Sequence, residues 1–161
     1  MRTMVKSEGF TPALIHAILV SVIVIGVIIF VIYHKPFIGP VLLLLGFLPW
    51  IPLKIAGREI KSVGADIIFG AIDTAFLGIA ALIGASFVGV LGAIVGGAAG
   101  DAITDGFAGL FEGRMAQFLR KRGIDEARTP LSSSMGKMSG CLIGVGIVLT
   151  IAWTIMRMQI G

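Results

Sequence analysis

The chain has 161 residues, of which 57% are hydrophobic and only 14% are charged. This composition excludes an ordinary soluble domain and predicts an all-α integral membrane protein, because a helix satisfies its backbone polar groups internally within a bilayer. The net charge of +4 does not predict a nucleic-acid partner. Its basic residues stand mainly in short segments beside apolar runs, where they set membrane orientation.

Five apolar runs are each close to the roughly 20 residues that cross the hydrocarbon core of a bilayer. They predict a single transmembrane domain over residues 1–161, folded as a compact bundle of about five helices. The second run contains Pro40, Pro49 and Pro52, so its helix is expected to be kinked or short, and whether it spans fully stays open. The predicted spans are residues 12–33, 37–55, 63–83, 87–110 and 138–157, with a cytoplasmic loop at residues 111–137.

The distribution of lysine and arginine predicts the orientation of these spans. With the N-terminus in the cytoplasm, only Lys35 and Arg157 fall in outer segments, and the other basic residues fall in inner ones. Cytoplasmic segments carry the excess of basic residues in membrane proteins. The sequence therefore predicts a cytoplasmic N-terminus and a C-terminus outside.

Carboxylates without basic partners are the main clue to function. Between Val63 and Gly113 the apolar, glycine-rich chain contains no Lys, Arg or His. An ionisable group at bilayer depth is costly, about 2.5–3.5 kcal/mol on insertion scales, and normally faces a partner, a cavity or an ion path. The carboxylates of this stretch are Asp66, Asp73, Asp101, Asp105 and Glu112.

Helical geometry places these carboxylates on two stripes. Asp66 and Asp73 share one face of the third predicted helix, because seven residues return within about 20° of the start. Asp101 and Asp105 lie with Glu112 on one face of the fourth, within about 40°. The short connection near residues 84–86 predicts that the two helices are antiparallel neighbours.

Facing acidic stripes predict a path for a cation. Asp73 and Asp101 would lie deepest, Asp66 and Asp105 level with each other near the cytoplasmic edge, and Glu112 at the entrance. Clustered carboxylates can bind a divalent cation or share protons. We therefore expect a small transporter or channel for a divalent metal or a proton, with Asp73, Asp101 and Asp105 as the hypothetical metal ligands. Hydroxyl oxygens could be added by Thr74, Ser86 and Thr104.

Glycines recur every four residues in the fourth and fifth predicted spans. Such stripes let helix backbones approach closely, and in the fourth span the stripe is expected to lie roughly opposite the carboxylates. The pattern favours packing within the chain, and it also allows a homo-oligomer or a partner in a larger membrane complex. The two stripes are Gly92, Gly96 and Gly100, and Gly136, Gly140 and Gly144.

Two other functions remain as alternatives. The chain could be an accessory subunit whose glycine faces dock onto a larger membrane complex. It could also be an enzyme, since the nine-residue pattern Gly97-x3-Asp101-x3-Asp105 resembles the second half of the metal-binding signature of the CDP-alcohol phosphotransferases. That resemblance implies metal-dependent transfer of a lipid head group. The first half of the signature is not matched, and Ile83, Gly84 and Ala85 stand in its region.

Overall fold

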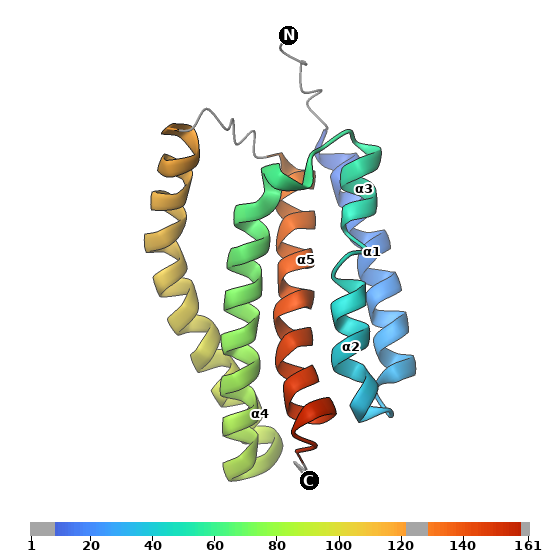
Figure 1. The fold of residues 1–161 in the computed structure, drawn as a ribbon, viewed down its shortest axis with the longest axis vertical. Helices are drawn as coiled ribbons and strands as arrows, with labels where there is room; N and C mark the ends of the chain where they lie inside the picture. The colour runs from blue at the N-terminus through green and yellow to red at the C-terminus, as the bar shows by residue number, and fades with distance from the viewer. Residues whose placement is uncertain (1–8, 122–128, 159–161) are drawn as a thin grey trace.

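The computed structural model describes residues 9–121 and 129–158, without the side chains of residues 108–113, 115–116 and 119–120. Every element in these ranges is helical, and the helices run up and down along one long axis (Figure 1). The elements are α1 (Phe10–Val31), α2 (Lys35–Leu45), α3 (Trp50–Ile55), the short 3₁₀-helix η1 (Ile60–Val63), α4 (Gly64–Lys121), α5 (Pro130–Leu149) and the π-helix η2 (Thr150–Ile155).

Four helices in the described part of the chain are long and apolar enough to cross a membrane. Their lengths and apolar composition are compatible with an integral membrane protein. The predicted number of five separate spans is not confirmed, because one of the four combines two of the predicted spans. The four are Phe10–Val31, Lys35–Ile55, Ile60–Phe107 and Pro130–Ile155.

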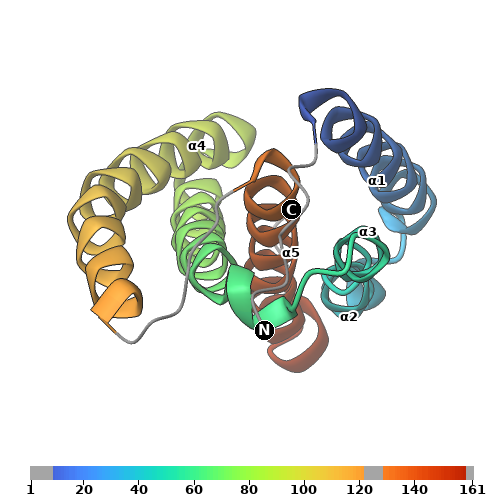
Figure 2. The ribbon, with the colours of Figure 1, turned by 90° about the horizontal axis from the view of Figure 1, so that it is seen from above.

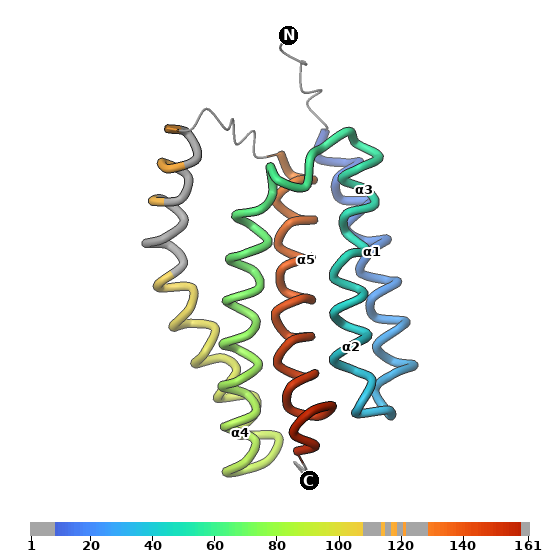
Figure 3. The backbone as a smooth tube through the Cα atoms, viewed as in Figure 1, coloured from blue at the N-terminus to red at the C-terminus, as the bar shows by residue number. Residues whose placement is uncertain are grey.

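Helix α4 is a hairpin. A straight helix of its 58 residues would be about 87 Å long, far longer than the roughly 30 Å hydrocarbon core. Val88 (φ −138°, ψ 31°) and Gly89 (φ 61°, ψ −134°) break the helical geometry. The chain reverses there, so that residues 64–87, the first arm, run antiparallel to residues 90–121, the second arm (Figures 1 and 3). The positive φ requires a glycine, because a Cβ disfavours this conformation.

The predicted cytoplasmic loop at residues 111–137 is helical in its described parts, and its location relative to a membrane stays a prediction. Residues 111–121 continue α4, and residues 130–137 form the first two turns of α5. The start of α5 is set by a capping box, in which the Thr129 side chain accepts from the Ser132 backbone N–H and the Ser132 hydroxyl oxygen accepts from the Thr129 N–H. Capping residues and helix-forming side chains act locally and are not seen by a hydropathy window.

The second predicted span is a broken helix. Helices α2 and α3 are separated by a turn at residues 46–49, as the prolines predicted. Fully buried Ser139 of α5 compensates for the break: its hydroxyl donates to the Gly46 carbonyl oxygen at 2.7 Å and accepts from Trp50 Nε1 at 2.8 Å. A side chain from a neighbouring helix thus satisfies the backbone that the break leaves unpaired, as broken membrane helices require.

Helix α5 occupies the middle of the bundle, between the first arm of α4 and α2 (Figure 2). A Cβ added at Gly140 would overlap the carbonyl oxygen of Ile67, and one at Gly144 would overlap that of Ala71. The α4 and α5 backbones are therefore in direct contact, which only residues without a side chain allow.

The apolar core lies where α1, α3, η1 and α5 meet. Within the described residues, the second arm of α4 contributes no side chain to this cluster. The second arm is therefore held in place chiefly by its contacts with the first arm. The core residues are Ala13, Val20, Val24, Leu53, Val63, Leu131 and Met135.

Candidate functional site: the hairpin of α4

The two arms of α4 touch through their backbones near the bend. A Cβ at Gly84 would overlap the carbonyl oxygen of Gly92, and a Cβ at Gly92 would overlap that of Gly84. One turn further from the bend, a Cβ at Gly96 would overlap the carbonyl oxygen of Ala80. At Gly100 it would come within 2.8 Å of the Ala80 Cβ. The glycine stripe of the second arm is therefore the face that meets the first arm.

Asp73 and Thr104 meet across the hairpin at the end of this contact. Asp73 precedes Val88 by 15 residues, and Thr104 follows Gly89 by 15 residues, so the two lie at the same height. The Thr104 hydroxyl donates to Oδ1 of Asp73. It also lies 3.0 Å from each of the carbonyl oxygens of Gly100 and Asp101, which are alternative acceptors for its single hydrogen.

Asp73 and Thr104 can form a hydrogen bond whether the carboxyl group is ionised or protonated. With Asp73 ionised, Thr104 donates to the carboxylate, a charge-assisted bond. With Asp73 protonated, the carboxyl group can donate to the Thr104 oxygen while the hydroxyl donates to the Gly100 carbonyl oxygen at 3.0 Å. The contact between the arms therefore survives a change in the protonation of Asp73.

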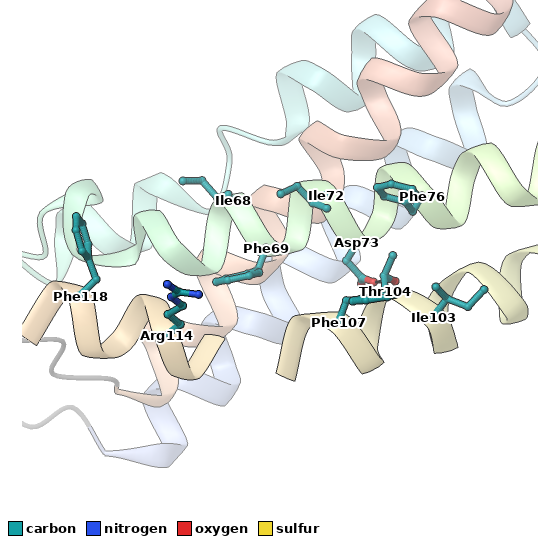
Figure 4. A pocket seen from close by; sticks show the side chains of 10 residues that line it. All are labelled: Ile68, Phe69, Ile72, Asp73, Phe76, Ile103, Thr104, Phe107, Arg114 and Phe118. Carbon is teal, nitrogen blue, oxygen red and sulfur yellow. Dashed lines mark hydrogen bonds between the residues drawn. The ribbon is translucent and has the colours of Figure 1, made fainter. Parts of the chain in front are cut away.

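A cavity of about 760 Å³ opens beyond this pair, between the arms. Asp73 and Thr104 lie toward one end of it, and Arg114 and Phe118 lie toward the other (Figure 4). Most of the described wall is apolar, and Asp73 is the carboxylate among the described residues that line it. They are Ile68, Phe69, Ile72, Asp73, Phe76, Ile103, Thr104, Phe107, Arg114 and Phe118.

The other predicted carboxylates are not gathered around Asp73. Asp66 is buried and lies against α5, where a Cβ at Gly136 would come within 2.8 Å of the Asp66 Cβ. Asp101 is half-buried and Asp105 is exposed. The side chain of Glu112 lies outside the described residues.

The position of the bend explains why Asp66 and Asp105 are not level with each other, as the sequence had predicted. A turn at residues 84–86 would put Asp66 level with Asp105. The bend at Val88 and Gly89 instead puts Asp105 level with residue 72, one position from Asp73. A shift of the turn by three residues moves the facing partner by about six, which is nearly two helical turns.

Among the described residues, no three His, Cys, Asp or Glu side chains gather as a group that could hold a metal ion. The proposed ligand set of Asp73, Asp101 and Asp105 stays a prediction. The structure brings Asp73 together with a hydroxyl group and with the Asp101 backbone carbonyl, through Thr104.

Sequence reasoning missed the apolar wall and Arg114 as parts of the site. Arg114 was counted as a charge that sets orientation. Exposed apolar residues spaced by four, at 68, 72 and 76 in the first arm and at 103 and 107 in the second, are the signal for the wall. Such a stripe cannot be told from an ordinary lipid-facing surface until the arms are placed.

No protein-family model matches the chain, and comparisons with curated proteins and with solved structures return no match. The fold and the site alone describe the class of this protein. Its described residues form helices, several of them apolar and of membrane length, and a helical hairpin with a cavity between its arms.

Proposed function

We propose that this protein moves a small cation across a membrane, and that Asp73 is the group that binds it. The supporting observation is a half-buried carboxylate in an apolar cavity, bonded to Thr104 of the facing arm. Asp73 is nine residues into α4, about 14 Å along the helix. If the hydrocarbon core of about 30 Å begins where α4 begins, the carboxylate would lie close to its middle. Carboxylates at that depth are typically parts of ion or proton paths.

A proton is the cation that this geometry favours over a divalent metal. The Asp73 and Thr104 pair has two hydrogen-bonding arrangements that differ by one proton, whereas a divalent cation prefers six or more oxygen ligands. Passage to the other side would require the arms to separate where Gly84 and Gly92 touch, because the backbones close the hairpin there.

The test is flux into liposomes that contain the purified full chain. A pH-sensitive dye reports protons, and a metal-quenched dye reports Mn²⁺. We expect proton flux in the wild type, and in Asp73→Asn we expect it to fall to the rate of protein-free liposomes. The matched control is Glu59→Gln, which makes the same carboxyl-to-amide change at an exposed position before η1 and should leave flux unchanged.

The outcome separates the alternatives. Mn²⁺ flux lost in Asp73→Asn would make the cargo a divalent metal. Equal proton flux in the wild type and Asp73→Asn would refute the role of Asp73. No flux in any variant would refute transport by the isolated chain and favour an accessory subunit or a lipid enzyme. The glycine stripes add no argument for the accessory subunit, because their close contacts lie within this chain.

A further inference from the structure

The wall of the α4 cavity is a continuous apolar surface left exposed by the fold. Ile68, Ile72, Phe76, Ile103 and Phe107 line the cavity, and each has between 50% and 60% of its surface exposed. Exposed apolar side chains occur on every long helix of this protein, and these five differ in lining the cavity between the two arms. In a protein with membrane-length helices, the molecules that surround such a wall are lipids.

Arg114 places a cation at one end of this wall. It follows Thr104 by ten residues on the same arm, about 15 Å along the helix. Within the described ranges, its exposed guanidinium group makes no hydrogen bond or ion pair. A guanidinium group binds phosphate oxygens in a bidentate manner. Lys121, also exposed, follows two turns later at the end of the arm.

We propose that the cavity is a binding site for an anionic phospholipid, with an acyl chain between the arms and the phosphate group at Arg114. Among the described residues, the lining is apolar for most of its length and basic at one end (Figure 4), which complements a molecule with a long apolar tail and an acidic head. The volume of about 760 Å³ falls in the range of ligand sites, roughly 300–1,000 Å³.

This inference does not rest on the proposed transport function. It is carried by the apolar wall and Arg114, whereas transport is carried by Asp73 and Thr104. If both are correct, the lipid tail covers the Asp73 side of the cavity, so that lipid occupancy regulates access to the carboxylate.

The test is native mass spectrometry of the full chain released from detergent micelles. The probes are phosphatidylglycerol and phosphatidylcholine with identical acyl chains, titrated separately. We expect the wild type to retain one phosphatidylglycerol about fivefold more strongly, since a basic residue near the surface attracts an anionic lipid by about that factor. In Arg114→Gln the two lipids should be retained equally, whereas Lys54→Gln, an exposed charge on α3 away from the cavity, should keep the preference.

A second variant tests the apolar wall. Ile72→Trp narrows the cavity and should lower retention of both lipids, whereas Ile25→Trp, at a similarly exposed position on α1, should not. If Arg114→Gln fails to fold, as judged by circular dichroism, then Arg114→Lys should fold and keep a weaker preference, because its charge remains and the bidentate contact is lost. Equal retention of both lipids by the wild type would overturn the proposal. So would a preference that survives Arg114→Gln, or a dimer mass without lipid, which would identify a second copy as the occupant.

Discussion

Replacing Ser139 by alanine tests how the broken helix of α2 and α3 is stabilised. Ser139 is fully buried, and its hydroxyl bridges two groups on the other side of the break. The Gly46 carbonyl oxygen accepts from it at 2.7 Å, and Trp50 Nε1 donates to it at 2.8 Å. Ser139→Ala removes the bridge and leaves both groups without this partner.

The expected cost is about 1–3 kcal/mol of unfolding free energy. A buried polar group that loses its partner costs about 1–3 kcal/mol. The Gly46 carbonyl oxygen bears the full cost, because among the described residues no backbone N–H donates to it outside the helices. Half-buried Trp50 adds less, and side-chain hydrogen bonds in membranes average only about 0.6 kcal/mol in double-mutant cycles.

The assay is unfolding by SDS in mixed micelles, followed by tryptophan fluorescence. The matched control is Ser134→Ala in the same helix, where the hydroxyl donates only to the Leu131 carbonyl oxygen of its own helix at 3.3 Å. That change should cost less than about 0.5 kcal/mol. Trp50→Phe removes one side of the bridge and should cost less than Ser139→Ala. Equal stabilities of Ser139→Ala and Ser134→Ala would refute the reasoning.

The same unfolding assay checks three further predictions. Gly89→Ala should lower the free energy of unfolding by about 1–3 kcal/mol because of the positive φ of 61° at this residue. Gly26→Ala, at a helical glycine with open space at Cβ, should raise it by up to about 1 kcal/mol. Equal effects would contradict the requirement for glycine at the bend. Gly140→Ala should lower the free energy of unfolding by about 1–3 kcal/mol, because the new Cβ would overlap the Ile67 carbonyl oxygen and force α4 and α5 apart. Unchanged stability would show that the two helices can separate without cost. Thr129→Ala should lower the free energy of unfolding by about 1 kcal/mol, because it removes the capping box of α5. No loss of stability would mean that α5 begins elsewhere.

Much of the fold could be predicted from local patterns. The apolar composition indicated helices of membrane length, the prolines indicated the break between α2 and α3, and the short connection between the third and fourth predicted spans indicated antiparallel arms. These features depend on residues close together in the chain. The extent of helix within residues 111–137 was harder to predict, since hydropathy alone does not register helix caps or the helix propensity of polar residues.

The site could be predicted only in part. Asp73 was singled out because a carboxylate in an apolar helix is costly. Its partner Thr104, and the separation of Asp66 from it, depended on where the chain reverses. The predicted turn lay three residues too early, and that error moved every facing pair along the hairpin.

By itself, the sequence determined that this protein is made of apolar helices with acidic side chains in the hairpin segment, because hydropathy and charge are properties of short windows. Only the tertiary structure decided that Thr104 bonds Asp73, that Ser139 bridges the broken helix, and that Arg114 ends an apolar cavity. Thr104 and Asp73 are 31 positions apart, and Ser139 and Gly46 are 93 positions apart. The cavity is lined by residues from both arms of the hairpin. The formation of these contacts depends on helix register, which is set by the bend at Gly89 and by the close approach of glycine backbones.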